Sequence, residues 1–219
     1  MSTRPTTGWT KLGLIIALLG IPAIVTAQHL LLPDLTPAMK ATREVLILAL
    51  SAFLLWIIVK GERLPLSSVG FRTGQIGRSL GWGVGVAVVA FAAVLGCLAA
   101  YSVLGIHYGE NGSISRSLPV TFLTISRAGF SEELFYRGYA IERIQALTGN
   151  KWLAAVVTLL AFGLFHFWLG AAGVVLALVL GAVFTAFYLW KRDLIAVMFA
   201  HFLVDFVPNV LLPLLGAGS

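Results

Sequence analysis

Charged residues are scarce in this chain of 219 residues. They make up 11% of the sequence, whereas hydrophobic residues make up 59%, and the mean hydropathy is +0.96. A soluble domain carries about 25% charged residues. So few charges cannot cover a surface that faces water, and we therefore expect the lipid bilayer to surround most of the chain.

Cysteine and long basic runs are also nearly absent. Cys97 is the one cysteine, which excludes an intrachain disulfide and a zinc site built from several cysteines. The net charge is +6, yet the longest basic run is Lys191-Arg192. Nucleic-acid binding needs a basic stripe or cluster, so we expect no nucleic-acid partner. The excess of positive charge instead fits the cytoplasmic loops of a membrane protein.

Hydrophobic runs occupy most of the chain. A helix that crosses a bilayer needs about 20 consecutive apolar residues. Runs of this kind occur at about 12–31, 44–60, 79–105, 119–141, 152–168, 172–190 and 194–215. The sequence therefore predicts an all-α, polytopic transmembrane bundle of about seven spans, with six to eight compatible, and a single membrane domain over residues 1–219.

The basic residues also predict the orientation of the bundle. With about seven spans, ten Lys and Arg residues fall on the side of the N-terminus, whereas the other side holds Lys40, Arg43 and Arg116. Cytoplasmic loops carry the excess of Lys and Arg, which predicts a cytoplasmic N-terminus. The first run could instead be a cleaved signal peptide, because residues 25–27 read Val-Thr-Ala. We favour a retained first helix.

Three charged side chains lie inside the fourth run. The segment reads Ser131-Glu132-Glu133-Leu134-Phe135-Tyr136-Arg137-Gly138. A charge at the bilayer centre costs at least about 2.5–3.5 kcal/mol on insertion scales, so it needs compensation. In an α-helix Glu133 and Arg137 share one face, which predicts an ion pair. Glu132 is rotated by about 100° and left unpaired. We therefore interpret Glu132 as the working carboxylate; a purely structural network of ion pairs is the alternative.

Two later runs each contribute a histidine. His166 ends the segment Phe162-Gly163-Leu164-Phe165-His166, and His201 precedes Asp205 by four residues, which places both on one helix face. Lipid cannot satisfy polar side chains, so membrane bundles pack them inward. The sequence therefore predicts that Glu132, His166, His201 and Asp205 converge.

These four side chains are suited to hydrolysis. Hydrolysis needs a base that activates water, a group that stabilises the oxyanion and an acid for the leaving amine. Glu132 and His166 can activate water, and His201 and Asp205 can face the oxyanion. The same four residues could instead hold a divalent metal such as zinc. The sequence contains no H-E-x-x-H helix, and Ser131 stands in an incomplete G-x-S-x-G motif.

The three motifs resemble those of the CPBP family of intramembrane proteases, which comprises CAAX proteases and bacteriocin-processing enzymes and is also called the Abi family. The family motifs are E-E-x-x-x-R, F-x-x-x-H, and H-x-x-x-N or a similar polar residue. Here they read Glu132-Glu133 to Arg137, Phe162 to His166, and His201 to Asp205, in order on successive hydrophobic runs. The resemblance covers residues 120–206, within a motif-bearing part at about 119–215.

The resemblance implies a helical bundle with a polar chamber inside the membrane. Glu132 and His166 would activate water, and His201 and Asp205 would hold the oxyanion, with Glu133, Arg137 and Phe162 as the remaining motif residues. Eukaryotic CAAX enzymes have Asn where this chain has Asp205, and an ionised Asp cannot donate a hydrogen bond. Asp205 would then be protonated, orient His201 or bind a metal.

Our first hypothesis is therefore an intramembrane endopeptidase, glutamate-dependent or metal-dependent, that acts on a hydrophobic or lipid-modified, CAAX-like peptide or protein. The alternative is a proton- or ion-coupled carrier, because buried Glu and His residues also build proton relays. Carriers usually show internal repeats and interrupted helices, and we find neither in the sequence. A catalytically silent immunity or scaffold protein is the third hypothesis.

Overall fold

The computed structural model describes residues 7–32, 35–108 and 117–216, and every regular element within these ranges is helical. The longer helices are α1 (Thr7–Leu31), α2 (Pro37–Trp56), α3 (Ile76–Leu104), α4 (Leu118–Arg127), η4 (Ala128–Ile141), α6 (Lys151–Phe165), α7 (Gly170–Lys191) and α8 (Leu194–Phe206). The shorter ones are η1 (Ile57–Gly61), η2 (Leu66–Val69), η3 (Thr73–Gln75), α5 (Glu142–Thr148), η5 (His166–Leu169), η6 (Val207–Leu211) and α9 (Leu212–Leu214).

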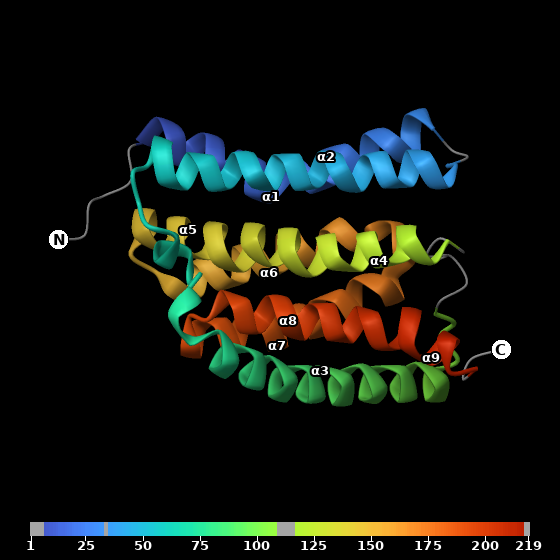
Figure 1. Ribbon diagram of the computed structural model, residues 1–219. Helices are drawn as coiled ribbons and strands as arrows, with labels where there is room; N and C mark the ends of the chain where they lie inside the picture. The colour runs from blue at the N-terminus through green and yellow to red at the C-terminus, as the bar shows by residue number, and fades with distance from the viewer. Residues whose placement is uncertain (1–6, 33–34, 109–116, 217–219) are drawn as a thin grey trace.

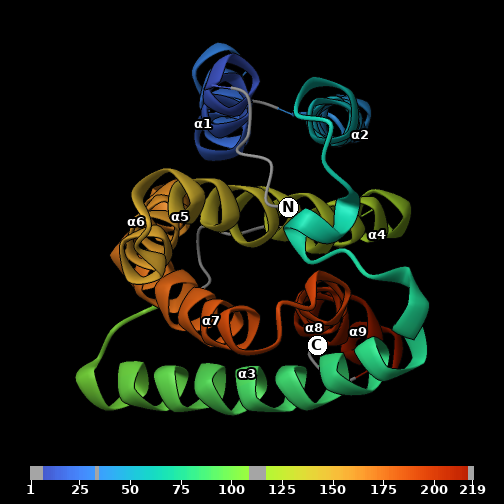
Figure 2. The same cartoon turned by 90° about the vertical axis from the view of Figure 1, so that its left-hand side faces the viewer.

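The helices lie side by side and form three layers (Figures 1 and 2). One outer layer consists of α1 and α2. The middle layer consists of the continuous helix α4–η4–α5 together with α6. The third layer consists of α7 and α8, and α3 covers its outer side. The helix α4–η4–α5 therefore lies between the other two layers, which places the charged motif of η4 in the interior.

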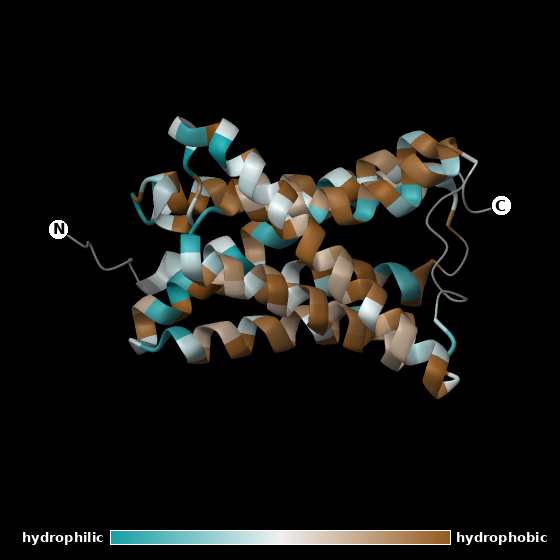
Figure 3. Ribbon diagram, turned by 90° about the horizontal axis from the view of Figure 1, so that it is seen from below, coloured by the Kyte–Doolittle hydropathy of each residue, from teal (hydrophilic) through white to brown (hydrophobic). Residues whose placement is uncertain are grey.

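The apolar surface of this bundle fits a membrane. Figure 3 shows that hydrophobic residues predominate along the helices. Five stretches are long and apolar enough to cross a bilayer by length and composition: Gly8–Leu31, Pro37–Gly61, Thr73–Leu104, Lys151–Lys191 and Leu194–Leu214. The fourth stretch has 41 residues and contains both α6 and α7. Together with α4–η4–α5, the arrangement confirms the prediction of an all-α transmembrane bundle of about seven spans, and the protein is an integral membrane protein.

Two glycines allow α8 to approach its neighbours closely. A Cβ atom on Gly129 of η4 would lie 2.9 Å from the carbonyl oxygen of Met198, and one on Gly83 of α3 would lie 2.9 Å from that of Ala196. Small residues at helix contacts let the backbones approach in membrane bundles. Helix α8 is thereby fixed between η4 and α3, with His201 turned toward the charged motif.

The segment η4 is a π-helix of 14 residues, and 13 of them are buried. A π-helix has i→i+5 hydrogen bonds, and such helices occur often at functional sites. In this geometry residues five apart share a face, whereas in an α-helix they are separated by about 140°. The side chains of η4 therefore have neighbours that an α-helical pattern does not predict.

Helix α6 is shorter than the fifth hydrophobic run. The run was expected to continue to residue 168, but α6 has 15 residues and ends at Phe165, followed by the short 3-10 segment η5 and then by α7. At 1.5 Å per residue α6 is about 22 Å long, less than the hydrocarbon core of a bilayer, about 30 Å. His166 therefore lies at the end of a helix too short to span that core.

Candidate active site

Glu133 joins the first and third motifs. Its Oε1 atom accepts a hydrogen bond from Arg137 at 2.9 Å and another from Nδ1 of His201 at 2.7 Å. The Glu133 and Arg137 side chains are 0% and 1% exposed, so the ion pair expected from their spacing is present and fully buried. Arg137 also donates to the carbonyl oxygen of Gly181 on α7 at 3.2 Å. These contacts connect η4 with α7 and α8.

Phe162 brings the second motif to the other two. The guanidinium carbon of Arg137 lies 4.2 Å from the centroid of the Phe162 ring. The ring centroids of His166 and His201 lie 4.8 Å and 6.4 Å from the same ring. A cation over an aromatic face is attracted by the ring quadrupole. Phe162 is thus the point at which residues of all three motifs meet.

The hydrogen bond of His166 determines which ring nitrogen is free. Its Nδ1 atom lies 2.8 Å from the carbonyl oxygen of Phe162. A carbonyl oxygen can only accept, so Nδ1 carries the hydrogen. In the neutral ring, Nε2 then has a lone pair and can accept a proton. The end of α6 therefore leaves Nε2 of His166 able to accept a proton, because the preceding turn supplies the carbonyl that fixes the tautomer.

Glu132 has a partner, so the prediction of an unpaired carboxylate is wrong. Its Oε1 atom accepts a hydrogen bond from Arg127 at 2.7 Å. The two residues are five apart, and the π-helix beginning at residue 128 gives them the shared face that an α-helix would not. The Oε2 atom of Glu132 has no hydrogen-bond partner among the described residues. Glu132 is 5% exposed and interacts electrostatically with His166 and His201.

Two residues of this site were not predicted. Arg127 was visible in the fourth hydrophobic run, but its partner could not be deduced. Arg127 also donates through Nε to Glu44 on α2, and Glu44 is 0% exposed. The presence of Glu44 early in the second hydrophobic run was the only available sign that it needed a buried partner. The sequence could not identify that partner, because Glu44 and Arg127 are 83 residues apart.

Asp205 lies at the more open side of the site. Its Oδ2 atom is 3.6 Å from Nε2 of His201, beyond hydrogen-bonding distance, and its side chain is 32% exposed. The side chains of His201 and Glu132 are less exposed, at 10% and 6%. At this distance Asp205 can attract a protonated His201 ring, but it makes no hydrogen bond that would fix the orientation of that ring.

The donor atoms do not fit a metal site. Within the described ranges, no group of three or more His, Cys, Asp and Glu side chains is arranged to hold a metal ion. One atom of each of three side chains is engaged in a hydrogen bond: Glu132 with Arg127, His166 with the carbonyl of Phe162, and His201 with Glu133. These hydrogen bonds leave the second carboxylate oxygen or ring nitrogen of each side chain outside the contact.

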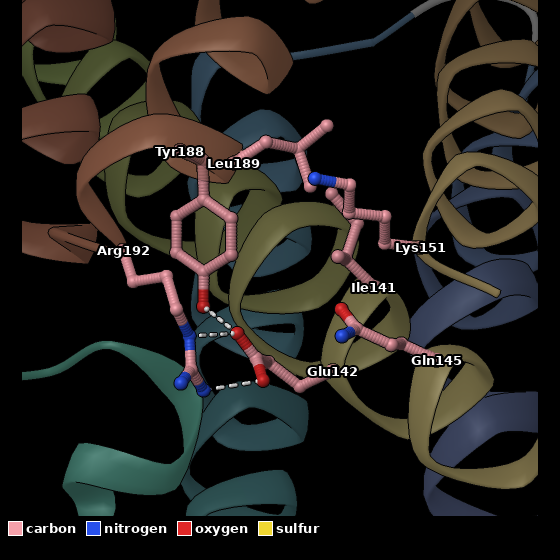
Figure 4. Close-up of a pocket in the computed structure, with 7 residues that line it drawn as sticks. All are labelled: Ile141, Glu142, Gln145, Lys151, Tyr188, Leu189 and Arg192. Atoms are coloured by element: carbon pink, nitrogen blue, oxygen red, sulfur yellow. Dashed lines mark hydrogen bonds and ion pairs between the residues drawn. The ribbon is translucent and has the colours of Figure 1, made fainter. Parts of the chain in front are cut away.

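A separate polar pocket lies at the end of the bundle where α6 begins (Figure 4). Glu142 accepts hydrogen bonds there from the Tyr188 hydroxyl at 3.0 Å and from Nε of Arg192 at 2.8 Å. Burial alone lowers the pKa of Arg192, but the Glu142 carboxylate outweighs burial and raises it. None of the motif residues lines this pocket, so these contacts serve to join α5 to the end of α7.

Comparison with known families agrees with the motifs. Residues 114–207 match a family model described as "Rce1-like: Type II CAAX prenyl endopeptidase Rce1-like". No curated protein and no solved structure shows a significant match to the chain. The matched segment contains all three motifs, and it confirms the resemblance to the CPBP family. This part of the chain is therefore similar to the Rce1-like family of type II CAAX prenyl endopeptidases, whereas α1, α2 and α3 lie outside the match.

Proposed function

We propose that the protein is an intramembrane endopeptidase that hydrolyses a peptide bond in a hydrophobic or lipid-modified, CAAX-like peptide or protein. The observation that carries this proposal is the convergence of the three motifs in the buried interior. His201 bonds to Glu133 at 2.7 Å, and Phe162 contacts Arg137 and both histidines. The family match over residues 114–207 supports a peptidase of the CAAX type.

Water activation is the first step of the proposed mechanism. Glu132 offers the free oxygen Oε2, and His166 offers the lone pair of Nε2. A water molecule that donates to both atoms would lose one proton to this pair as its oxygen attacks the carbonyl carbon of the substrate. General bases must lie within hydrogen-bonding reach, directly or through one water, of the proton that they remove.

Stabilisation of the oxyanion is the second step. Glu133 fixes the ring of His201 through Nδ1 and leaves Nε2 on the side of Asp205. When Nε2 carries a proton, it can donate to the negative oxygen that forms on the substrate. Fixed donors of this kind lower the barrier because they need no reorganisation during the reaction. The proton taken from water would then pass to the leaving amine.

The fold also supports the orientation predicted from the basic residues. Lys60 lies in the last turn of η1, Lys191 ends α7, and Lys151 begins α6. These helix ends lie at the end of the bundle where α1 begins (Figure 1). Lys40 and Arg43 lie near the start of α2, at the opposite end. We propose that the first end is cytoplasmic, and that substrate reaches Glu132 from the bilayer as an extended segment.

The test is cleavage by the purified protein in detergent and in liposomes. The substrates are a fluorogenic prenylated CAAX peptide, the same peptide without the lipid, and a library of hydrophobic peptides. We expect the wild type to cleave and the variants Glu132→Gln and His166→Ala to lose at least about 100-fold in rate. Glu142→Gln, which removes a carboxylate that bonds to Tyr188 and Arg192 and to none of the motif residues, should retain activity.

Two outcomes would contradict the proposal. Retention of cleavage by Glu132→Gln would remove the glutamate from the mechanism. Ion uptake by proteoliposomes that depends on Glu132, without cleavage of any peptide, would favour the carrier. Metal analysis of the same samples would show whether activity follows bound zinc.

A further inference from the structure

Arg127 joins two buried carboxylates that come from different helices. It donates through Nε to Oε2 of Glu44 on α2 and through an Nη atom to Oε1 of Glu132 on η4, the latter at 2.7 Å. The side chains of Arg127, Glu44 and Glu132 are 7%, 0% and 6% exposed. Hydrogen bonds between charged groups in such surroundings are about twice as strong as neutral ones.

The contacts continue beyond Glu44 and form what we call the polar row: Gln28, Arg43, Glu44, Arg127 and Glu132. Arg43 donates to Oε1 of Glu44 at 2.9 Å and to Oε1 of Gln28 at 3.1 Å. Each oxygen of Glu44 is therefore bound to an arginine, and two cations balance two carboxylates along the row. An unpaired charge in the membrane interior is costly, so the loss of one member affects its neighbours.

The polar row has a specific consequence for Glu132. Arg127 holds Oε1, whereas Oε2 has no partner among the described residues. A guanidinium is a planar fork that donates in two directions, whereas the ammonium of lysine is a compact point charge. Arg127 binds Glu44 and Glu132 through two separate nitrogen atoms, an arrangement that the single nitrogen of a lysine cannot reproduce. Glu44 in turn prevents Arg127 from moving away from the site.

We propose that Arg127 is a positioning residue that fixes the Glu132 carboxylate for water activation, and that Glu44 holds Arg127 in place. This inference rests on the proposed peptidase function. It extends the site to α2, since Glu44 lies outside the residues matched by the family model. The first two helices would then contribute to catalysis as well as to the fold.

The first test compares two buried arginines. Arg143 pairs with Glu62 at 2.8 Å, with side chains 4% and 0% exposed, but it contacts none of the motif residues. We expect Arg127→Lys to lower kcat for the prenylated CAAX peptide by about 100-fold, because a misplaced catalytic group can cost that much. KM should stay nearly unchanged, since substrate binding does not use Arg127. Glu44→Gln should likewise lower kcat and leave KM nearly unchanged.

The matched control Arg143→Lys should retain the wild-type kcat in its folded fraction. A purely structural function of Arg127 would give both lysine variants the same kcat after correction for the folded amount. Wild-type kcat in Arg127→Lys would overturn the positioning proposal, while the peptidase function would stand on the activity of the wild type and its loss in Glu132→Gln.

The second test does not depend on activity. Melting temperatures are compared for the wild type, Arg127→Gln, Glu132→Gln and the double variant, with Arg127→Lys in place of Arg127→Gln if the latter does not fold. If Arg127 holds Glu132, both single variants break the same Arg127–Glu132 contact. The double variant should then melt no lower than the Arg127 variant alone, because no further contact is lost. Additive decreases would overturn the proposal. If the wild type cleaves no peptide, the peptidase function fails, and this cycle still decides whether Arg127 fixes Glu132.

Discussion

Replacement of Glu133 by glutamine tests the centre of the site most directly. Glu133 is 0% exposed, and its Oε1 atom accepts from both Arg137 and His201. The change Glu133→Gln removes the counter-charge of Arg137, whose side chain is 1% exposed, without a large change in volume. Arg137 then remains as a buried cation with no carboxylate bound to it.

The expected cost follows from this burial. Removal of one partner from a buried ion pair destabilises a protein by about 3–5 kcal/mol, because the other charge is left uncompensated. The Arg192–Glu142 pair offers a comparison, since its side chains are 47% and 12% exposed. Pairs open to solvent contribute about 0.2–1 kcal/mol. Glu133→Gln should therefore cost several times more free energy of unfolding than Glu142→Gln.

The assay is reversible unfolding in mixed detergent micelles, followed by circular dichroism. The double variant Glu133→Gln/Arg137→Met serves as a control. It should recover much of the lost free energy, because it removes the buried Arg137 cation that Glu133→Gln leaves uncompensated. Equal losses for Glu133→Gln and Glu142→Gln would refute the reasoning, as would a double variant less stable than the single one.

Three further predictions concern other residues. Tyr136→Phe should leave the melting temperature unchanged or raise it, because the buried Tyr136 hydroxyl has no partner within the described part of the chain and such a group costs about 1–3 kcal/mol; a lower melting temperature in a thermal scan would contradict this. Asp205→Asn should retain peptidase activity, because an amide can donate to an oxyanion where an ionised carboxylate cannot; complete loss of kcat would show that the charge is required. In a Cys97→Ala background, Gln145→Cys should react with an impermeant thiol reagent only from the cytoplasmic side and Ala38→Cys only from the other side. Labelling of whole cells and of inverted vesicles measures this, and labelling of Gln145→Cys in whole cells would contradict the proposed orientation.

The sequence predicted the features that depend on hydrophobic length and local spacing. About seven apolar runs led to the transmembrane bundle, and the four-residue spacing of Glu133 and Arg137 led to their ion pair. Membrane burial of polar groups also led us to expect that the motifs meet, and Phe162 does contact both histidines. The catalytic assignments themselves remain predictions until the variants are measured.

The sequence did not reveal the partner of Glu132, for two physical reasons. Hydrophobic periodicity does not distinguish the i→i+5 hydrogen bonds of η4 from those of an α-helix, because η4 is buried on nearly all sides and has no exposed face that would set a period. The contact between Glu44 and Arg127 depends on how α2 packs against α4, which local spacing cannot specify. The early end of α6 at Phe165 was hidden as well, because the apolar sequence continues through Phe167 and Trp168.

The geometry of η4 gives two consecutive carboxylates separate counter-ions. Glu132 is held by an arginine five residues before it, and Glu133 by an arginine four residues after it. Two acids that are adjacent in the chain are thereby neutralised by different arginines. In the proposed mechanism, Glu133 would keep the bundle and His201 in place while Glu132 exchanges protons with water.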